Sequence, residues 1–68
     1  MSGVDEQLDA IASRLEQIVV DLDELAFDRL REAVADGAAE RPRGDKELAR
    51  ARRAAEKAAH VLRQLADG

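Results

Sequence analysis

Large apolar residues recur along the first half of the chain at alternating steps of four and three. The series comprises Val4, Leu8, Ile11, Leu15, Ile18, Leu22 and Leu25. This heptad spacing places one apolar stripe along an α-helix. The stripe then shifts by one place and continues through Ala26, Leu30 and Ala33. The pattern predicts a long helix over residues 3–36, capped by Ser2 at its start and ended by Gly37 in the left-handed conformation.

A break and a shorter heptad series follow. Residues 37–44, GAAERPRG, contain two glycines and Pro42, which cannot lie inside a helix. The second series comprises Leu48, Ala51, Ala55, Ala58, Leu62 and Leu65. It predicts a helix over residues 45–66 with Asp45 as its N-cap. A connection this short favours antiparallel packing. The predicted fold is therefore all-α, an antiparallel two-helix hairpin that forms a single domain over residues 1–68.

The two predicted helices are unequal in length and in apolar content. At 1.5 Å per residue they span about 50 Å and 33 Å, so Val4, Leu8 and Ile11 should extend beyond the shorter helix. The long helix carries twelve Val, Leu, Ile or Phe residues, whereas the short helix carries four. Each large side chain left in water forgoes roughly 1.5–3 kcal/mol. The imbalance predicts that another protein surface completes the core.

A second apolar row, Val20, Phe27 and Val34, repeats every seven residues. It lies roughly 120–160° around the helix from the main stripe, so one alanine-rich helix cannot cover both rows. Single exposed apolar residues are ordinary, but three in register indicate a contact surface. The predicted protein interface comprises Val4, Leu8, Ile11, Val20, Phe27, Leu30 and Val34. The simplest partner is a second copy, in a homodimer that forms a four-helix bundle or in a tetramer. The alternative is a helical partner protein.

The charges give a weaker indication of a ligand. Five arginines cluster in thirteen residues and form a candidate anion or nucleic-acid patch: Arg41, Arg43, Arg50, Arg52 and Arg53. Against nucleic acid stand the 15 acids facing 11 bases, the net charge of −4 and the single aromatic residue, Phe27. The bases of the second helix fall mostly on its outer face, with Arg52, Glu56 and Arg63 on a flank. Charge complementarity with the acidic first helix, which includes the row Asp21, Glu24 and Asp28, is the favoured interpretation.

Residues for catalysis are scarce. The chain has no Cys, one His at position 60, and hydroxyls only at Ser2 and Ser13. No nucleophile–base pair can be assembled from these within one chain. Glu56 and His60 are four residues apart, which favours an exposed ion pair over a metal site. We therefore expect a protein that is not an enzyme, with no cofactor, no metal and no small-molecule substrate. The polar N-terminus and the lack of a long apolar run predict a cytoplasmic protein outside the membrane.

The segment LEQIVVDLD, residues 15–23, resembles the first helix of the small subunit of exonuclease VII. That subunit is a short helical hairpin that serves a larger catalytic subunit. The likeness covers nine residues of common heptad letters. It ends where that family has a glycine and this chain continues through LAFDRLREAV.

The sequence as a whole predicts a non-catalytic, homo-oligomeric protein–protein interaction or scaffold protein. A small accessory or regulatory subunit of a larger protein, such as a transcription factor or an enzyme, is the alternative. A nucleic-acid binder that uses the arginine cluster is the second alternative.

Overall fold

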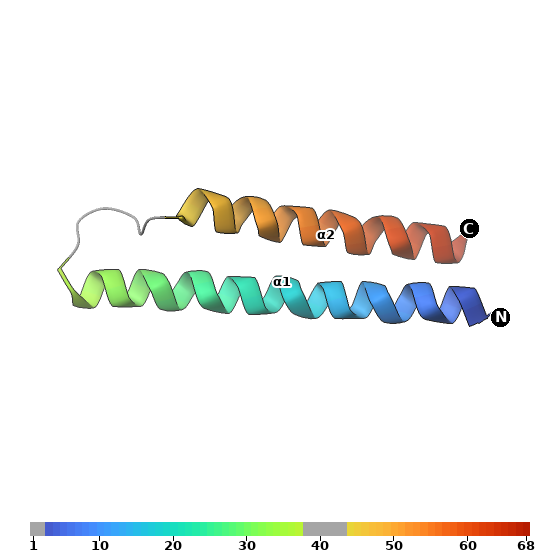
Figure 1. The fold of residues 1–68 in the computed structure, drawn as a ribbon, viewed down its shortest axis with the longest axis horizontal. Helices are drawn as coiled ribbons and strands as arrows, with labels where there is room; N and C mark the ends of the chain where they lie inside the picture. The colour runs from blue at the N-terminus through green and yellow to red at the C-terminus, as the bar shows by residue number, and fades with distance from the viewer. Residues whose placement is uncertain (1–2, 38–43) are drawn as a thin grey trace.

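Two α-helices lie side by side and run in opposite directions (Figure 1). The computed structural model describes residues 3–37 and 44–68. Helix α1 spans Gly3–Ala35 and helix α2 spans Asp45–Asp67. The described residues contain no strand. The predicted all-α class and both helices are confirmed, with boundaries that differ from the expected ones by one residue at most.

Glycines in the left-handed conformation stand at the end of α1 and the start of α2. Gly37, with φ of 80°, donates its N–H to the carbonyl of Val34 at 3.0 Å, as expected for a helix terminator. Gly44, with φ of 87°, accepts a bond from the N–H of Leu48 at 2.9 Å and is itself the N-cap. The prediction of Asp45 as N-cap is therefore wrong. Asp45 is the first helical residue, where its charge suits the positive end of the helix dipole. The predicted cap at Ser2 lies outside the described residues.

The helices meet along only part of the predicted stripes, together with a neighbouring row on each helix. On α1 the covered rows are Leu8, Leu15 and Leu22 together with Ala12, Val19 and Ala26. On α2 they are Leu48, Ala55 and Leu62 together with Arg52, Ala59 and Ala66. Ile11, Ile18 and Leu25, which the heptad series placed between the helices, are instead more than 40% exposed. Both helices are rotated so that small alanines lie between them, and small residues let two helices approach closely.

The alignment of the two helices along their axes, meaning which residues of α2 lie beside which residues of α1, also differs from the prediction. Arg63 contacts Asp9 and Glu16, so α2 extends well past Ile11 towards the start of α1. The predicted overhang of Leu8 and Ile11 is therefore wrong. The unpaired part of α1 lies at its other end, where α2 begins short of the last turns of α1 (Figure 1). The prediction assumed that α2 starts level with the end of α1.

The hairpin buries very little by itself. Among the described residues only Ala12, Val19 and Ala59 are buried, and no large side chain is fully buried. Ten large apolar side chains stay exposed, which is most of the sixteen in the two helices. A chain of this size with no disulfide depends on its apolar core for stability. Burial of these exposed apolar side chains against another surface would therefore add more stability than any contact within the hairpin.

We expect Gly44→Ala to destabilise the hairpin by about 1–2 kcal/mol, because an L-residue at this positive φ is strained. The added Cβ would lie 3.4 Å from the Arg29 guanidinium, an ordinary van der Waals contact, so the loss comes from the backbone strain. Gly44→Asn should lose less, since Asn tolerates left-handed angles. Urea denaturation followed by circular dichroism measures both. Gly3→Ala, whose Cβ meets nothing within 4 Å, is the control and should lose nothing. Equal stability of Gly44→Ala and the unaltered chain would contradict the role of Gly44.

Candidate interaction surfaces

One broad side of the hairpin is held together by ion pairs, and we call it the polar face. Its charged residues are Asp9, Glu16 and Asp23 on α1 and Arg52, Glu56 and Arg63 on α2. The three carboxylates of α1 are spaced by seven residues. Each follows a leucine of the covered row by one place, so all three lie on the same flank of the helix. The polar face thus runs along much of the contact between the helices.

Arg63 is the most connected residue of the polar face. Its guanidinium donates to Glu16 Oε1 at 2.6 Å, to Glu16 Oε2 at 3.1 Å, to Asp9 Oδ1 at 3.2 Å and to Ser13 Oγ at 3.1 Å. Hydrogen bonds to Glu16 raise the pKa of Arg63, and the same bonds lower the pKa of the Glu16 carboxyl. The fork geometry of arginine suits several acceptors at once. Arg63 therefore fixes the level of α2 against the first half of α1.

Arg52 plays the same part nearer the loop. Its Nε donates to Asp23 of α1, and its Nη1 donates to Glu56 one turn along α2 at 3.0 Å. The bond to Asp23 is the main cause of the raised pKa of Arg52. The pair with Asp23 confirms the predicted charge complementarity of the helices, and the pair with Glu56 lies within α2. The carboxylates that meet α2 are nevertheless Asp9, Glu16 and Asp23, not the predicted row Asp21, Glu24 and Asp28.

The opposite side of the hairpin, which we call the apolar face, carries exposed apolar rows on both helices. On α1 the row is Val4, Ile11, Ile18 and Leu25, all exposed, and on α2 it is Ala51 and Leu65, both exposed, with the half-buried Ala58 between them. Each row repeats every seven residues and precedes a covered row by one place. In an antiparallel pair, equal offsets from the covered rows fall on the same side of both helices. Because the polar-face residues Glu16 and Arg63 follow a covered row by one place, the two apolar rows share the other side.

A third exposed feature, the Phe27 patch, consists of Phe27, Leu30 and Val34 near the end of α1. Leu30 continues the seven-residue row of Asp9, Glu16 and Asp23, so this patch lies away from the apolar face. The guanidinium of Arg31 lies 5.9 Å from the centroid of the Phe27 ring, within cation–π range.

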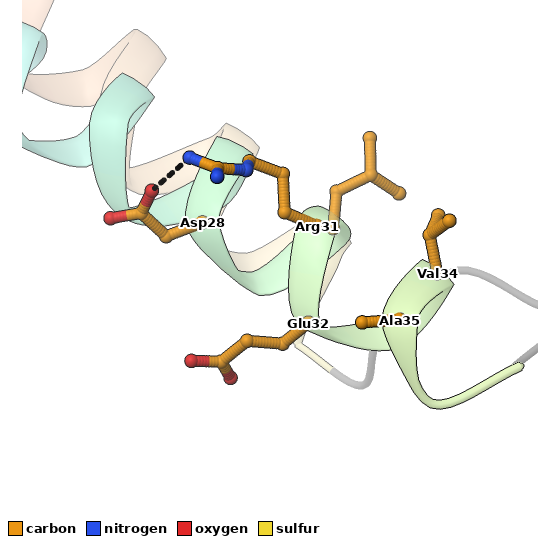
Figure 2. A pocket seen from close by; sticks show the side chains of 6 residues that line it. Asp28, Arg31, Glu32, Val34 and Ala35 are labelled. Carbon is orange, nitrogen blue, oxygen red and sulfur yellow. Dashed lines mark ion pairs between the residues drawn. The ribbon is translucent and has the colours of Figure 1, made fainter.

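Leu30 and Val34 of the Phe27 patch also line a shallow hollow of about 760 Å³. Figure 2 shows the side chains of the hollow, with the guanidinium of Arg31 directed towards the carboxylate of Asp28. The two groups form an ion pair of 4.0 Å. The lining residues of the hollow are Asp28, Leu30, Arg31, Glu32, Val34 and Ala35.

The seven predicted interface residues are thus divided among several positions. Val4 and Ile11 lie on the apolar face, and Leu8 is half-buried between the helices. Phe27, Leu30 and Val34 form the Phe27 patch, and Val20 lies one seven-residue step before Phe27 on the same outer row. Ile18 and Leu25 belong to the exposed surface, whereas the heptad series predicts them in the contact between the helices. Their heptad spacing could have identified them, but it could not tell which way α1 is turned.

The arginine cluster is only partly described. Arg41 and Arg43 lie outside the described residues. Arg52 is held by Asp23 and Glu56, whereas Arg50 and Arg53 are exposed. Three positions separate Arg50 from Arg53 on the outer side of α2, so both face away from α1.

Two further features concern metals and membranes. Within residues 3–37 and 44–68, no group of three or more His, Asp or Glu side chains could hold a metal ion. His60 is exposed beside a groove that Glu16, Glu56 and Arg63 also line. Neither α1 nor α2 combines the length and apolar content that a membrane crossing requires.

Comparison of the chain with protein-family models, with curated proteins and with solved structures finds no significant match. The resemblance of residues 15–23 to the small subunit of exonuclease VII therefore carries no family assignment. Inferences about function depend on the surfaces of the hairpin itself.

Acid should weaken the hairpin through Glu16, whose pKa lies below its ordinary value of 4.5 because Arg63 donates to the ionised carboxylate. The unfolded chain binds this proton more readily, so the stabilisation is complete above pH 4.5 and is lost as the pH falls through the lowered pKa. Urea midpoints measured across this range should fall, and Glu16→Gln should flatten the dependence. Glu24→Gln, an exposed site on α1, is the matched control. An equal slope in both variants would contradict the role of Arg63.

Proposed function

We propose that this chain is a non-catalytic protein–protein interaction module that acts as a homo-oligomer through its apolar face. The observation that carries the proposal is the division of the hairpin into two sides. On the polar face, arginines of α2 are paired with carboxylates of α1. On the other side, Ile11, Ile18 and Leu25 are left more than 40% exposed. Apolar rows at heptad spacing on one side of a helix pair are typical of half of a four-helix bundle.

The energetics of the hairpin favour such an assembly. Full burial of one large aliphatic side chain is worth roughly 1.5–3 kcal/mol. A two-fold dimer counts each of these side chains twice, because both copies present the same surface. On the apolar face, the small Ala51 and Ala58 of α2 lie beside the larger isoleucines and Leu25 of α1, which leaves room for large side chains of a partner helix. A partner on this side therefore supplies the core that the hairpin lacks.

Size also fits a dimer. The hairpin measures 54 × 15 × 11 Å, so the footprint of its broad side is comparable with the roughly 800 Å² that a specific interface of standard size buries on each partner. The broad polar side offers a similar area but carries charges that would need to be desolvated. The apolar face is therefore the side from which water is most readily removed.

A small accessory subunit of a larger protein is the second candidate function, and the Phe27 patch favours it. Phe27 and Val34 are each more than 60% exposed, beside a shallow hollow and away from the apolar face. A dimer joined through the apolar face leaves this patch open at each end. Such a dimer could carry two copies of a partner, as a scaffold does.

Ile18→Asp should dissociate the homo-oligomer, because each dimer would place two unpaired carboxylates in its core. Loss of the two isoleucines alone should raise the dissociation constant by about two orders of magnitude or more. Val20→Asp is the matched control, since Val20 is 46% exposed and Ile18 44% exposed in the hairpin. Light scattering across a dilution series, with circular dichroism on the same samples, measures mass and helicity. An unaltered chain that is monomeric and helical at every concentration would refute the proposal.

Phe27→Asp distinguishes the two apolar surfaces. If the apolar face joins the copies, this variant keeps the mass and the urea midpoint of the unaltered chain, because Phe27 is already in contact with water. Dissociation by Phe27→Asp and not by Ile18→Asp would place the homo-oligomer contact at the Phe27 patch instead. The same light-scattering series provides the readout.

A further inference from the structure

We propose that the second copy lies with its α1 antiparallel to α1, about a two-fold axis that passes between the two Ile18 residues and between the two Ala58 residues. This inference rests on the proposed homodimer and specifies how its halves are arranged. Two hairpins can pair through their apolar faces with two-fold symmetry in two ways. An axis parallel to the helices sets α1 beside α2 of the partner copy. An axis perpendicular to the helices sets α1 beside α1.

The ion pairs of the polar face fix which apolar residues stand level. Arg52 meets Asp23, and Arg63 meets Asp9 and Glu16. Interpolated along the two antiparallel helices, these contacts bring Leu65 level with Ile11, Ala58 with Ile18 and Ala51 with Leu25. Val4 lies beyond the end of α2 in this alignment, and the rest of the apolar face consists of three layers, each with one residue from each helix.

The size of the side chains in these layers favours the perpendicular axis. With the parallel axis, one end layer contains two isoleucines and two leucines (Ile11 and Leu65), and the other contains two leucines and two alanines (Leu25 and Ala51). With the perpendicular axis, positions equally far from Ile18 exchange places. Each end layer then receives Ile11 and Leu65 from one copy and Leu25 and Ala51 from the other. Cores pack at uniform density, so the balanced layers fill better.

Charged residues at the edge of the apolar face also favour the perpendicular axis. Arg14 and Asp21 lie three residues after Ile11 and Ile18, on the outer edge of α1. Both are exposed, and Asp21 accepts one hydrogen bond, from Gln17 Nε2 at 3.0 Å. The perpendicular axis brings Arg14 of each copy to Asp21 of the other. The parallel axis brings Asp28 towards Glu47 instead, which sets two like charges together.

Net charge is the opposing consideration. Helix α1 carries nine carboxylates and three arginines, so a contact between two α1 helices is repulsive at long range. Exposed charges farther apart than about 8 Å are largely screened at physiological ionic strength. The contact pairs at the edge therefore decide the arrangement. The axis also lies one residue from the midpoint of Gly3–Ala35, so the two α1 helices overlap along almost their full length.

The test is a charge exchange between two variants, Arg14→Glu and Asp21→Arg. Each variant alone should dimerise about tenfold more weakly than the unaltered chain, because two edge pairs per dimer change from attraction to repulsion. An equimolar mixture should recover the affinity of the unaltered chain, because both pairs become attractive in the heterodimer. Sedimentation equilibrium at physiological ionic strength gives the affinities. Native mass spectrometry gives the share of heterodimer, which should exceed random exchange.

Arg50→Glu is the matched control, since it makes the same charge change on the outer side of α2, and it should leave the affinity unchanged. An equal loss in Arg50→Glu and Arg14→Glu would trace the effect to net charge and overturn the arrangement. Unaltered affinity in both edge variants, with random exchange between them, would also overturn it while leaving the homodimer intact. A monomeric unaltered chain would instead overturn the homodimer itself, and this inference with it.

Discussion

Within residues 3–37 and 44–68, each helix packs against only one other helix. A helix packed against a single partner covers two adjacent rows of side chains, whereas the apolar residues of α1 occupy a wider arc. The covered rows contain Leu8, Leu15 and Leu22 with the smaller Ala12 and Val19, and the isoleucines beside them stay in contact with water. Because one neighbouring helix cannot cover all the apolar rows of α1, apolar surface remains exposed to water. The proposed homo-oligomer would cover this exposed surface.

The polar face has a structural role. Exposed ion pairs contribute little stability each, and salt screens them. Arg63 nevertheless joins three residues of α1, and Arg52 joins a fourth about two turns farther along, so sliding or turning α2 would break several bonds at once. By fixing the level and rotation of the helices, these pairs determine where the apolar rows stand. The polar face thus sets the geometry of the surface on the opposite side.

The two broad sides and the Phe27 patch suit an interaction protein with more than one contact. The proposed homodimer joins two hairpins along their lengths, so the Phe27 patches lie near opposite ends under the proposed arrangement. Their ring, leucine and valine could each anchor a helix of another protein. The outward bases of α2, among them Arg50 and Arg53, remain in water in such an assembly and favour its solubility.

Much of the fold followed from the sequence because its signals are local. Heptad spacing, Pro42 within residues 37–44 and the left-handed Gly37 predict the two helices and the break between them, because helix formation and termination depend on near neighbours. Charge signs also predicted that α2 lies against α1. The rotation of the helices, the level of Arg63 against Asp9 and Glu16, and the exposure of Ile11, Ile18 and Leu25 were decided by tertiary structure. A heptad stripe is wide enough that each helix could be rotated about its own axis by a fraction of a turn and still present apolar residues to the other. The packing of Ala12 against α2 and of Ala59 against α1, together with the ion pairs of Arg52 and Arg63, selects one of these rotations.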